Sequence, residues 1–110
     1  RLYKGKKIDH SKRKVAMAAH KAKYPEKVKA RGKADKIGKK DGLHNHHWSY
    51  NQEHWLDIVI INHIDHATAH RFMIYDQERM MYRTKDGILL DTKEAHVEYI
   101  NQFIKTKIAL

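Results

Sequence analysis

The sequence predicts an α+β domain in which two strands and a helix form a ββα unit, with basic helices before this unit and a hairpin and a helix after it. A chain of 110 residues suffices for one domain with a modest core. Charge divides the chain, since residues 1–42 hold 16 Lys/Arg against 4 Asp/Glu, whereas residues 43–110 hold 7 against 9. We therefore expect a basic helical arm and linker over residues 1–42 and a nearly neutral body over residues 43–110.

Two helices are expected in the basic arm. Residues 9–24 carry a thin apolar stripe at helical spacing, and Asp9 or Ser11 can cap the start of this helix. Pro25 suits the first turn of a second helix, which extends to about Ile37. This second helix has few apolar residues among many lysines and arginines, so it cannot bury much surface alone. We expect it to be mobile in the free protein and ordered on a partner, the alternative being a solvated charged arm.

The ββα unit follows a linker rich in Gly and Lys. We expect a short strand over residues 43–48 and then a polar loop. The β-branched, apolar run over residues 56–61 predicts a buried strand. Asn62 or Asp65 can then cap a helix that extends to about Tyr75.

A hairpin and a helix complete the predicted body. The Lys-Asp-Gly sequence at residues 85–87 is a strong turn signal between two short strand-forming runs, so we expect a hairpin over residues 81–91. Asp91 or Thr92 can cap the final helix. The apolar residues of this helix that we expect to face inward are Ala95, Val97, Ile100, Phe103 and Ile104.

Composition narrows the functional classes. The formal net charge of +10 favours a polyanionic partner, because phosphates bound by Lys and Arg release condensed counterions. The chain has no cysteine, which excludes disulfides and thiolate zinc sites and fits a reducing compartment, so we expect a cytoplasmic location. No apolar run approaches the ~20 residues that span a bilayer, so we expect no membrane partner.

Histidine is the compositional anomaly, since seven of the ten histidines fall between residues 44 and 70. His66 and His70 project from one face of a helix, at a spacing that suits one metal ion, although an isolated pair of this kind is most often ordinary. The tandem pair His46-His47 strengthens the metal hypothesis, because adjacent strand residues point to opposite faces. One of them can complete the metal site while the other takes a proton from an attacking water, as phosphodiester hydrolysis requires.

Three segments carry a family resemblance, namely His46-His47-Trp48-Ser49-Tyr50, Leu56-Asp57-Ile58-Val59 and the pair His66 and His70. Together they resemble the phage-type pattern of the HNH (ββα-metal) endonucleases of phages, homing elements and DNase colicins. Residues 24–30, with the sequence YPEKVKA, resemble the basic helix that often precedes this pattern. The resemblance implies a ββα-metal finger and a metal-dependent endonuclease that nicks or cuts DNA in a bacterial or phage-infected cell.

The same resemblance implies roles for individual residues. His46, His66 and His70 align with the metal ligands, His47 aligns with the general base, and Asp57 stands where many members place an Asn that braces the loop. One divalent ion is implied, and three imidazoles suit Zn²⁺, Ni²⁺ or Mn²⁺ better than Mg²⁺, which prefers oxygen ligands. Many relatives carry cysteine pairs that bind a stabilising zinc, and this chain has none. Its C-terminal hairpin and helix must therefore supply the missing core.

Double-stranded DNA is the expected partner, and we expect a monomer or a weak homodimer. The basic residues expected to bind nucleic acid are Lys12, Arg13, Lys14, Lys21, Lys27, Lys29, Arg31, Lys33 and Arg71. Arg71 follows the last ligand, where a phosphate contact and a plain surface arginine are equally expected. His44 is interpreted as a substrate-facing or surface residue rather than a spare ligand, and His63 as lying off the ligand face. His54 and His96 are interpreted as ordinary loop and helix residues.

Two other functions compete with the nuclease. A non-catalytic nucleic-acid-binding protein with an HNH-like fold is compatible with Asp57 and with the missing cysteines, and nuclease assays with several divalent metals separate it from the enzyme. A structural zinc module for protein contacts is disfavoured, because such an interface has no general need for so much charge of one sign.

Overall fold

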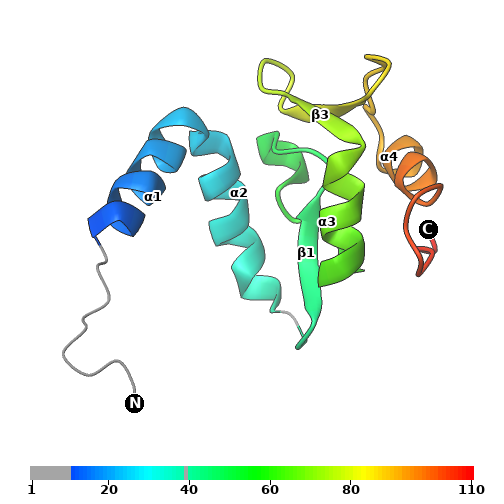
Figure 1. The fold of residues 1–110 in the computed structure, drawn as a ribbon, viewed down its shortest axis with the longest axis horizontal. Coiled ribbons are helices and arrows are strands. Elements are labelled where there is room, and N and C mark those ends of the chain that lie inside the picture. The colour runs from blue at the N-terminus through cyan, green and yellow to red at the C-terminus, as the bar shows by residue number, and fades with distance from the viewer. Residues whose placement is uncertain (1–10, 39) are drawn as a thin grey trace.

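A computed structural model gives the structure of residues 11–38 and 40–110, with side chains described from Arg13 onward. The described chain forms a mixed α+β domain with four α-helices and two small antiparallel sheets (Figure 1). The elements are α1 (Ser11–Lys23), α2 (Pro25–Ala34), β1 (Leu43–His47), β2 (Ile58–Asn62), α3 (His63–Arg71), β3 (Met73–Asp76), β4 (Met81–Thr84) and α4 (Lys93–Ile100). The predicted α+β class is confirmed at this level. The predicted cap Asp9 lies outside the described residues.

β1 and β2 pair antiparallel, and β2 leads directly into α3. Within the pair, His46 lies opposite Val59 and His47 lies opposite Ile58. Val59 and Ile61 are buried because alternate side chains of β2 face the core. The predicted order of strand, loop, strand and helix is therefore present.

α3 begins where the sequence predicts and ends earlier. Asn62 Oδ1 accepts the backbone N–H of Asp65 at 2.9 Å, so Asn62 is the cap. The prediction that this helix extends to about Tyr75 is wrong, because α3 ends at Arg71. Residues 73–76 form β3 instead, where their aromatic and β-branched side chains suit a strand paired with β4.

β3 and β4 form the second sheet, and the hairpin predicted over residues 81–91 is present in a shorter form beside it. The regular partner of β4 is β3, and Tyr75 lies opposite Tyr82 with ring centroids 5.2 Å apart. The predicted chain reversal at residues 85–87 is present, and Gly87 adopts a φ of 93° that favours glycine. Beyond this turn the returning chain pairs with β4 around one bridge, between Arg83 and Leu89, and the backbone N–H groups of Thr84 and Leu90 donate to carbonyl oxygens across it.

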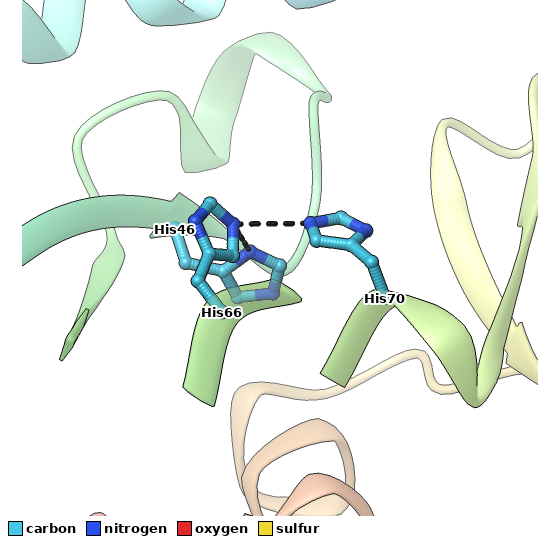
Figure 2. A group of neighbouring side chains, drawn as sticks. All are labelled: His46, His66 and His70. Carbon is cyan, nitrogen blue, oxygen red and sulfur yellow. Dashed lines mark hydrogen bonds between the residues drawn. The ribbon is translucent and has the colours of Figure 1, made fainter. Parts of the chain in front are cut away.

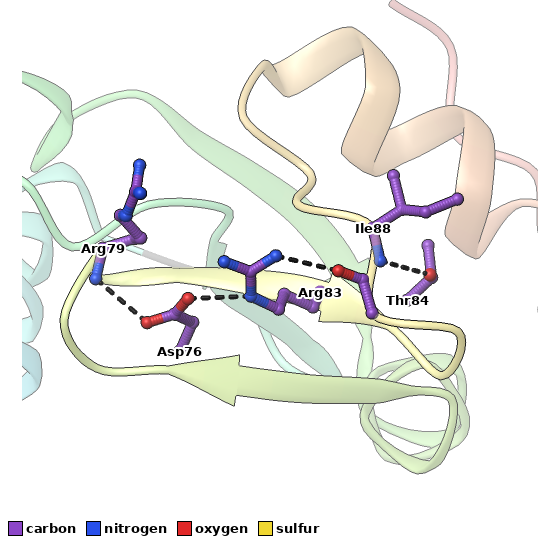
Figure 3. A network of polar contacts seen from close by, with 6 residues as sticks. Asp76, Arg79, Arg83, Thr84 and Ile88 are labelled. Atoms are coloured by element: carbon purple, nitrogen blue, oxygen red, sulfur yellow. Dashed lines mark hydrogen bonds and ion pairs between the residues drawn. The ribbon is translucent and has the colours of Figure 1, made fainter.

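Asp76 ties this hairpin together (Figure 3). Its carboxylate accepts the Nε–H of Arg83 at 2.8 Å and the backbone N–H of Arg79 at 3.1 Å. Thr84 Oγ1 accepts the backbone N–H of Ile88 at 3.1 Å across the following turn. These bonds hold the turn before β4 and the turn after it, so the inward side chains of β4 can pack into the core.

α2 packs against the body, in contrast to the expected mobile segment. Ala30 is fully buried and belongs to the same core cluster as Ile61. Glu26 Oε2 accepts a 2.5 Å hydrogen bond from the hydroxyl of Tyr75. A small side chain lets the helix backbone approach the body closely, so little apolar surface is needed. α1 instead projects away from the body (Figure 1). Its side chains at residues 13–19 are exposed.

The C-terminal part supplies core, as expected for a chain without stabilising cysteines. Thr92 caps α4, which confirms one of the two predicted caps. Ile100 and Ile104 belong to the core cluster. The backbone N–H groups of residues 105–106 donate to the buried carboxylate of Asp65 at 3.1 and 3.0 Å. These bonds fasten the segment after α4 to the first turn of α3.

Candidate metal centre

Three imidazoles meet between β1 and α3, and we call them the histidine cluster: His46, His66 and His70 (Figure 2). His66 Nε2 lies 3.1 Å from His46 Nδ1 and 3.0 Å from His70 Nε2. One nitrogen from each ring lies within 4.8 Å of the other two, so this group could hold a metal ion. His46 is buried, His66 is partly buried and His70 is exposed, so the cluster opens to solvent on the His70 side.

Regular local structure positions the cluster. His66 and His70 are one helical turn apart on the same face of α3, as their spacing predicts. His46 pairs with Val59 in β2, the strand that leads into α3. Asp65, next to His66, is held by the cap of α3 and by the segment after α4. The predicted meeting of the strand histidine and the helical pair is confirmed.

The electrostatics of the cluster suit a cation. Burial, together with neighbouring histidines, lowers the pKa of His66 to about 4 and lowers the pKa of His46 well below its usual value. Desolvation of the inner side of the ring, which contacts Tyr82, lowers the pKa of His70 to about 4. All three rings are therefore neutral near pH 7. His66 Nε2 faces the ring nitrogens of both His46 and His70 but can carry at most one proton, so it cannot donate to both. A bound cation would instead accept one nitrogen lone pair from each of the three rings.

His47 offers a separate base beside the cluster. Its Nε2 donates a 2.9 Å hydrogen bond to the carbonyl oxygen of Trp55, since a carbonyl can only accept. In the neutral ring, Nδ1 then carries the free lone pair. Burial lowers the pKa of His47, which keeps the ring neutral. Together with His66 and Arg31, His47 lines a pocket of about 340 Å³.

Asp57 bonds across the loop between β1 and β2. Its Oδ2 accepts the indole N–H of Trp48 at 3.2 Å, and its Oδ1 accepts a 2.8 Å hydrogen bond from Lys93. The bond to Lys93 lowers the pKa of Asp57, so the carboxylate is charged near pH 7. The loop also carries the Trp55 carbonyl that orients His47. This geometry is what a loop-bracing residue needs.

Two histidines that sequence reasoning set aside touch the cluster. His44 Nδ1 lies 2.9 Å from His66 Nδ1, on the side of that ring away from the cluster. His96 is fully buried, and its Nε2 lies 2.7 Å from His46 Nε2, so it is not an ordinary helix residue. The signal available in the sequence was a histidine on the otherwise apolar inner face of α4. Its contact partner could not be found, because 50 positions separate the two residues.

Comparison with protein-family models, curated proteins and solved structures finds no match for this chain. In the part of the chain that the structure describes, no helix is long and apolar enough to cross a membrane. Within the same residues, the histidine cluster is the only group of three or more His, Cys, Asp or Glu side chains that could hold a metal ion together.

Lys27 is placed differently from the other predicted nucleic-acid ligands. Its ammonium lies 4.0 Å from the ring centroid of Tyr75, 4.7 Å from that of Tyr24, and within 5.6 Å of those of Tyr50 and Tyr82. Burial lowers the pKa of Lys27 to about 8, so the side chain is still mostly charged at pH 7 and is attracted by the ring faces. Lys27 therefore fastens α2 to the body and is poorly placed to contact a phosphate.

Most of the other predicted basic residues are exposed. Those on α1 and α2 are Arg13, Lys14, Lys21, Lys29, Arg31 and Lys33, and Arg71 is exposed at the end of α3. Arg31 differs from its neighbours because it lines the pocket beside His47, and it also lies 3.2 Å from His20 Nε2. The side chain of Lys12 lies outside the described part of the chain.

Proposed function

We propose that this protein is a metal-dependent endonuclease of the HNH type that hydrolyses DNA phosphodiester bonds. The observation that carries the proposal is the presence of two histidine arrangements in one place. Three neutral ring nitrogens converge in the histidine cluster, and His47, in the adjoining pocket, keeps one free lone pair. Phosphodiester hydrolysis uses such a pair of arrangements, one to hold a cation and one to accept a proton.

The histidine cluster would hold one divalent ion. When bound, the ion would neutralise charge on the scissile phosphate and stabilise the leaving oxygen. Three imidazoles favour Zn²⁺, Ni²⁺ or Mn²⁺, whereas Mg²⁺ prefers oxygen ligands. Because His70 is the exposed member of the cluster, substrate would approach from its side.

His47 would act as the general base. Its Nδ1 would accept a proton from the attacking water, while the bond from Nε2 to the Trp55 carbonyl holds the ring in one orientation. The loop that carries this carbonyl is braced by Asp57. Protonation of His47 during the reaction would leave both ring nitrogens as donors, and the existing bond to a carbonyl favours that state.

Arg31 is expected to contact the phosphate beside the cleaved bond, because it is the basic residue that lines the pocket. Arg31→Gln should lower the rate of DNA cleavage by about 10–100-fold, since hydrogen bonds to charged groups contribute about 1.5–3 kcal/mol. Lys29→Gln is the matched control, because Lys29 is exposed on the same helix and does not line the pocket. Equal cleavage rates for the two variants in a plasmid assay would contradict this role.

The decisive test of the proposed function is a plasmid-cleavage assay with purified protein. We expect relaxed circular product to form with Zn²⁺, Ni²⁺ or Mn²⁺, and excess EDTA should abolish the reaction. Nicking is expected first, because one such site cuts one strand. If the protein binds DNA tightly and cuts it with none of several divalent metals, the alternative of a non-catalytic nucleic-acid-binding protein is favoured.

A further inference from the structure

His96 reaches the histidine cluster from a distant element. It lies on α4, is 0% exposed, and places its Nε2 2.7 Å from His46 Nε2. The two ring centroids are 4.9 Å apart. His96 Nδ1, on the other side of the ring, is buried without a hydrogen-bond partner. A histidine in this place thus makes one polar contact, and that contact is to a candidate metal ligand.

The contact constrains where the proton of His46 resides. His46 Nδ1 faces His66 Nε2 and is therefore the nitrogen that the cluster offers to a metal ion. A metal ligand must be bare of hydrogen, so the single proton of neutral His46 must lie on Nε2. This Nε2–H points at His96 Nε2, which must then be the acceptor. In the opposite arrangement, in which His96 donates, His46 would carry its proton on Nδ1 and could not bind metal.

We propose that His96 is a positioning residue that accepts the His46 Nε2–H bond and so holds His46 with a bare Nδ1 toward the cluster. The inference rests on the proposed metal centre. Metal-binding histidines usually give their second N–H to a carboxylate, a backbone carbonyl or water. Here the acceptor is a neutral imidazole, which fills this fully buried position without bringing in a charge.

This arrangement has a cost that supports a functional reason for it. When His96 accepts through Nε2, its own proton lies on Nδ1, which has no partner in the core. A buried donor without a partner destabilises the fold. An apolar side chain of similar size would avoid that cost, so packing alone does not explain a histidine at residue 96.

The inference predicts a loss of metal affinity without a matching loss of stability in the metal-free protein. His96→Leu removes the acceptor, and zinc affinity should fall about 10–100-fold, as is typical when the partner of a ligand histidine is lost. The melting temperature of the metal-free variant should stay close to that of wild type, because the loss of the partnerless His96 Nδ1–H is offset by leaving the buried His46 Nε2 without its partner. His96→Gln offers an amide oxygen near the original Nε2, so its zinc affinity should stay within about threefold of wild type.

Zinc binding would be measured by titration calorimetry and by chelator competition on the full chain, and melting by circular dichroism in EDTA. Val97→Ala is the control, because Val97 is buried on the same helix and should lower the melting temperature without changing zinc affinity. Wild-type zinc affinity in folded His96→Leu, or an equal loss of zinc affinity in the Leu and Gln variants, would overturn the role of His96. Neither result would overturn the proposed metal centre. If the wild-type protein binds none of Zn²⁺, Ni²⁺ and Mn²⁺, the metal centre is wrong and the inference falls with it.

Discussion

His47→Ala is expected to lower the rate of DNA cleavage by about 10²–10⁴-fold, the range that a general base typically contributes. Zinc binding and DNA binding should remain near wild type, because His47 bonds to the Trp55 carbonyl and is not part of the histidine cluster. Cleavage would be followed on supercoiled plasmid at saturating metal. Zinc affinity would be measured by calorimetry, and DNA affinity by fluorescence anisotropy in EDTA.

The control for this variant is His63→Ala. His63 is an exposed histidine at the start of α3, and it lies outside both the cluster and the pocket. Its removal should leave cleavage within about threefold of wild type, as expected for a surface change away from the site. Wild-type cleavage by His47→Ala would show that another group takes the proton. Loss of zinc binding in the same variant would show that His47 is a ligand instead.

His66→Ala is expected to have the largest effect on metal binding. Its Nε2 contacts both other members of the cluster, so its removal takes away one ligand and the group that links the other two. We expect zinc affinity to fall by more than the ~100-fold that loss of an outer partner can cost. Cleavage should fall to background. The same calorimetric and plasmid assays serve, with His63→Ala again as a control on the same helix.

Two results would contradict this prediction. A His66→Ala protein that binds zinc as tightly as wild type would show that the ion lies elsewhere. A variant that loses zinc but still cuts DNA at the wild-type rate would separate metal binding from catalysis. Circular dichroism of both variants in EDTA would show that the fold is retained.

The central part of the site could be predicted from the sequence because its geometry is local. A spacing of four residues places His66 and His70 on one helix face, whatever surrounds the helix. The β-branched run before α3 predicts β2, and His46 then lies in the strand paired with it. Caps such as Asn62 and Thr92 are also local, since each bonds within its own first turn.

The features that were missed depend on distant partners. Residues 73–76 carry side chains that suit a helix end or a strand, and pairing with β4 decides for the strand. The packing of α2 rests on small buried side chains such as Ala30, which a hydrophobic pattern does not distinguish from a solvated helix. Lys27 was expected to be a phosphate ligand because three of the four tyrosines around its ammonium, Tyr50, Tyr75 and Tyr82, are distant from it in the sequence.

The different placement of α1 and α2 has a consequence for how the proposed endonuclease would act on a long duplex. α2 is fastened to the body and carries Arg31 into the pocket, whereas α1 stands clear with its cationic side chains in solvent. Contacts made by α1 would involve counterion release and so weaken as ionic strength rises. Ionic strength would then set the residence time of the protein on a duplex. The rate of cleavage at a phosphate already bound in the site would change little.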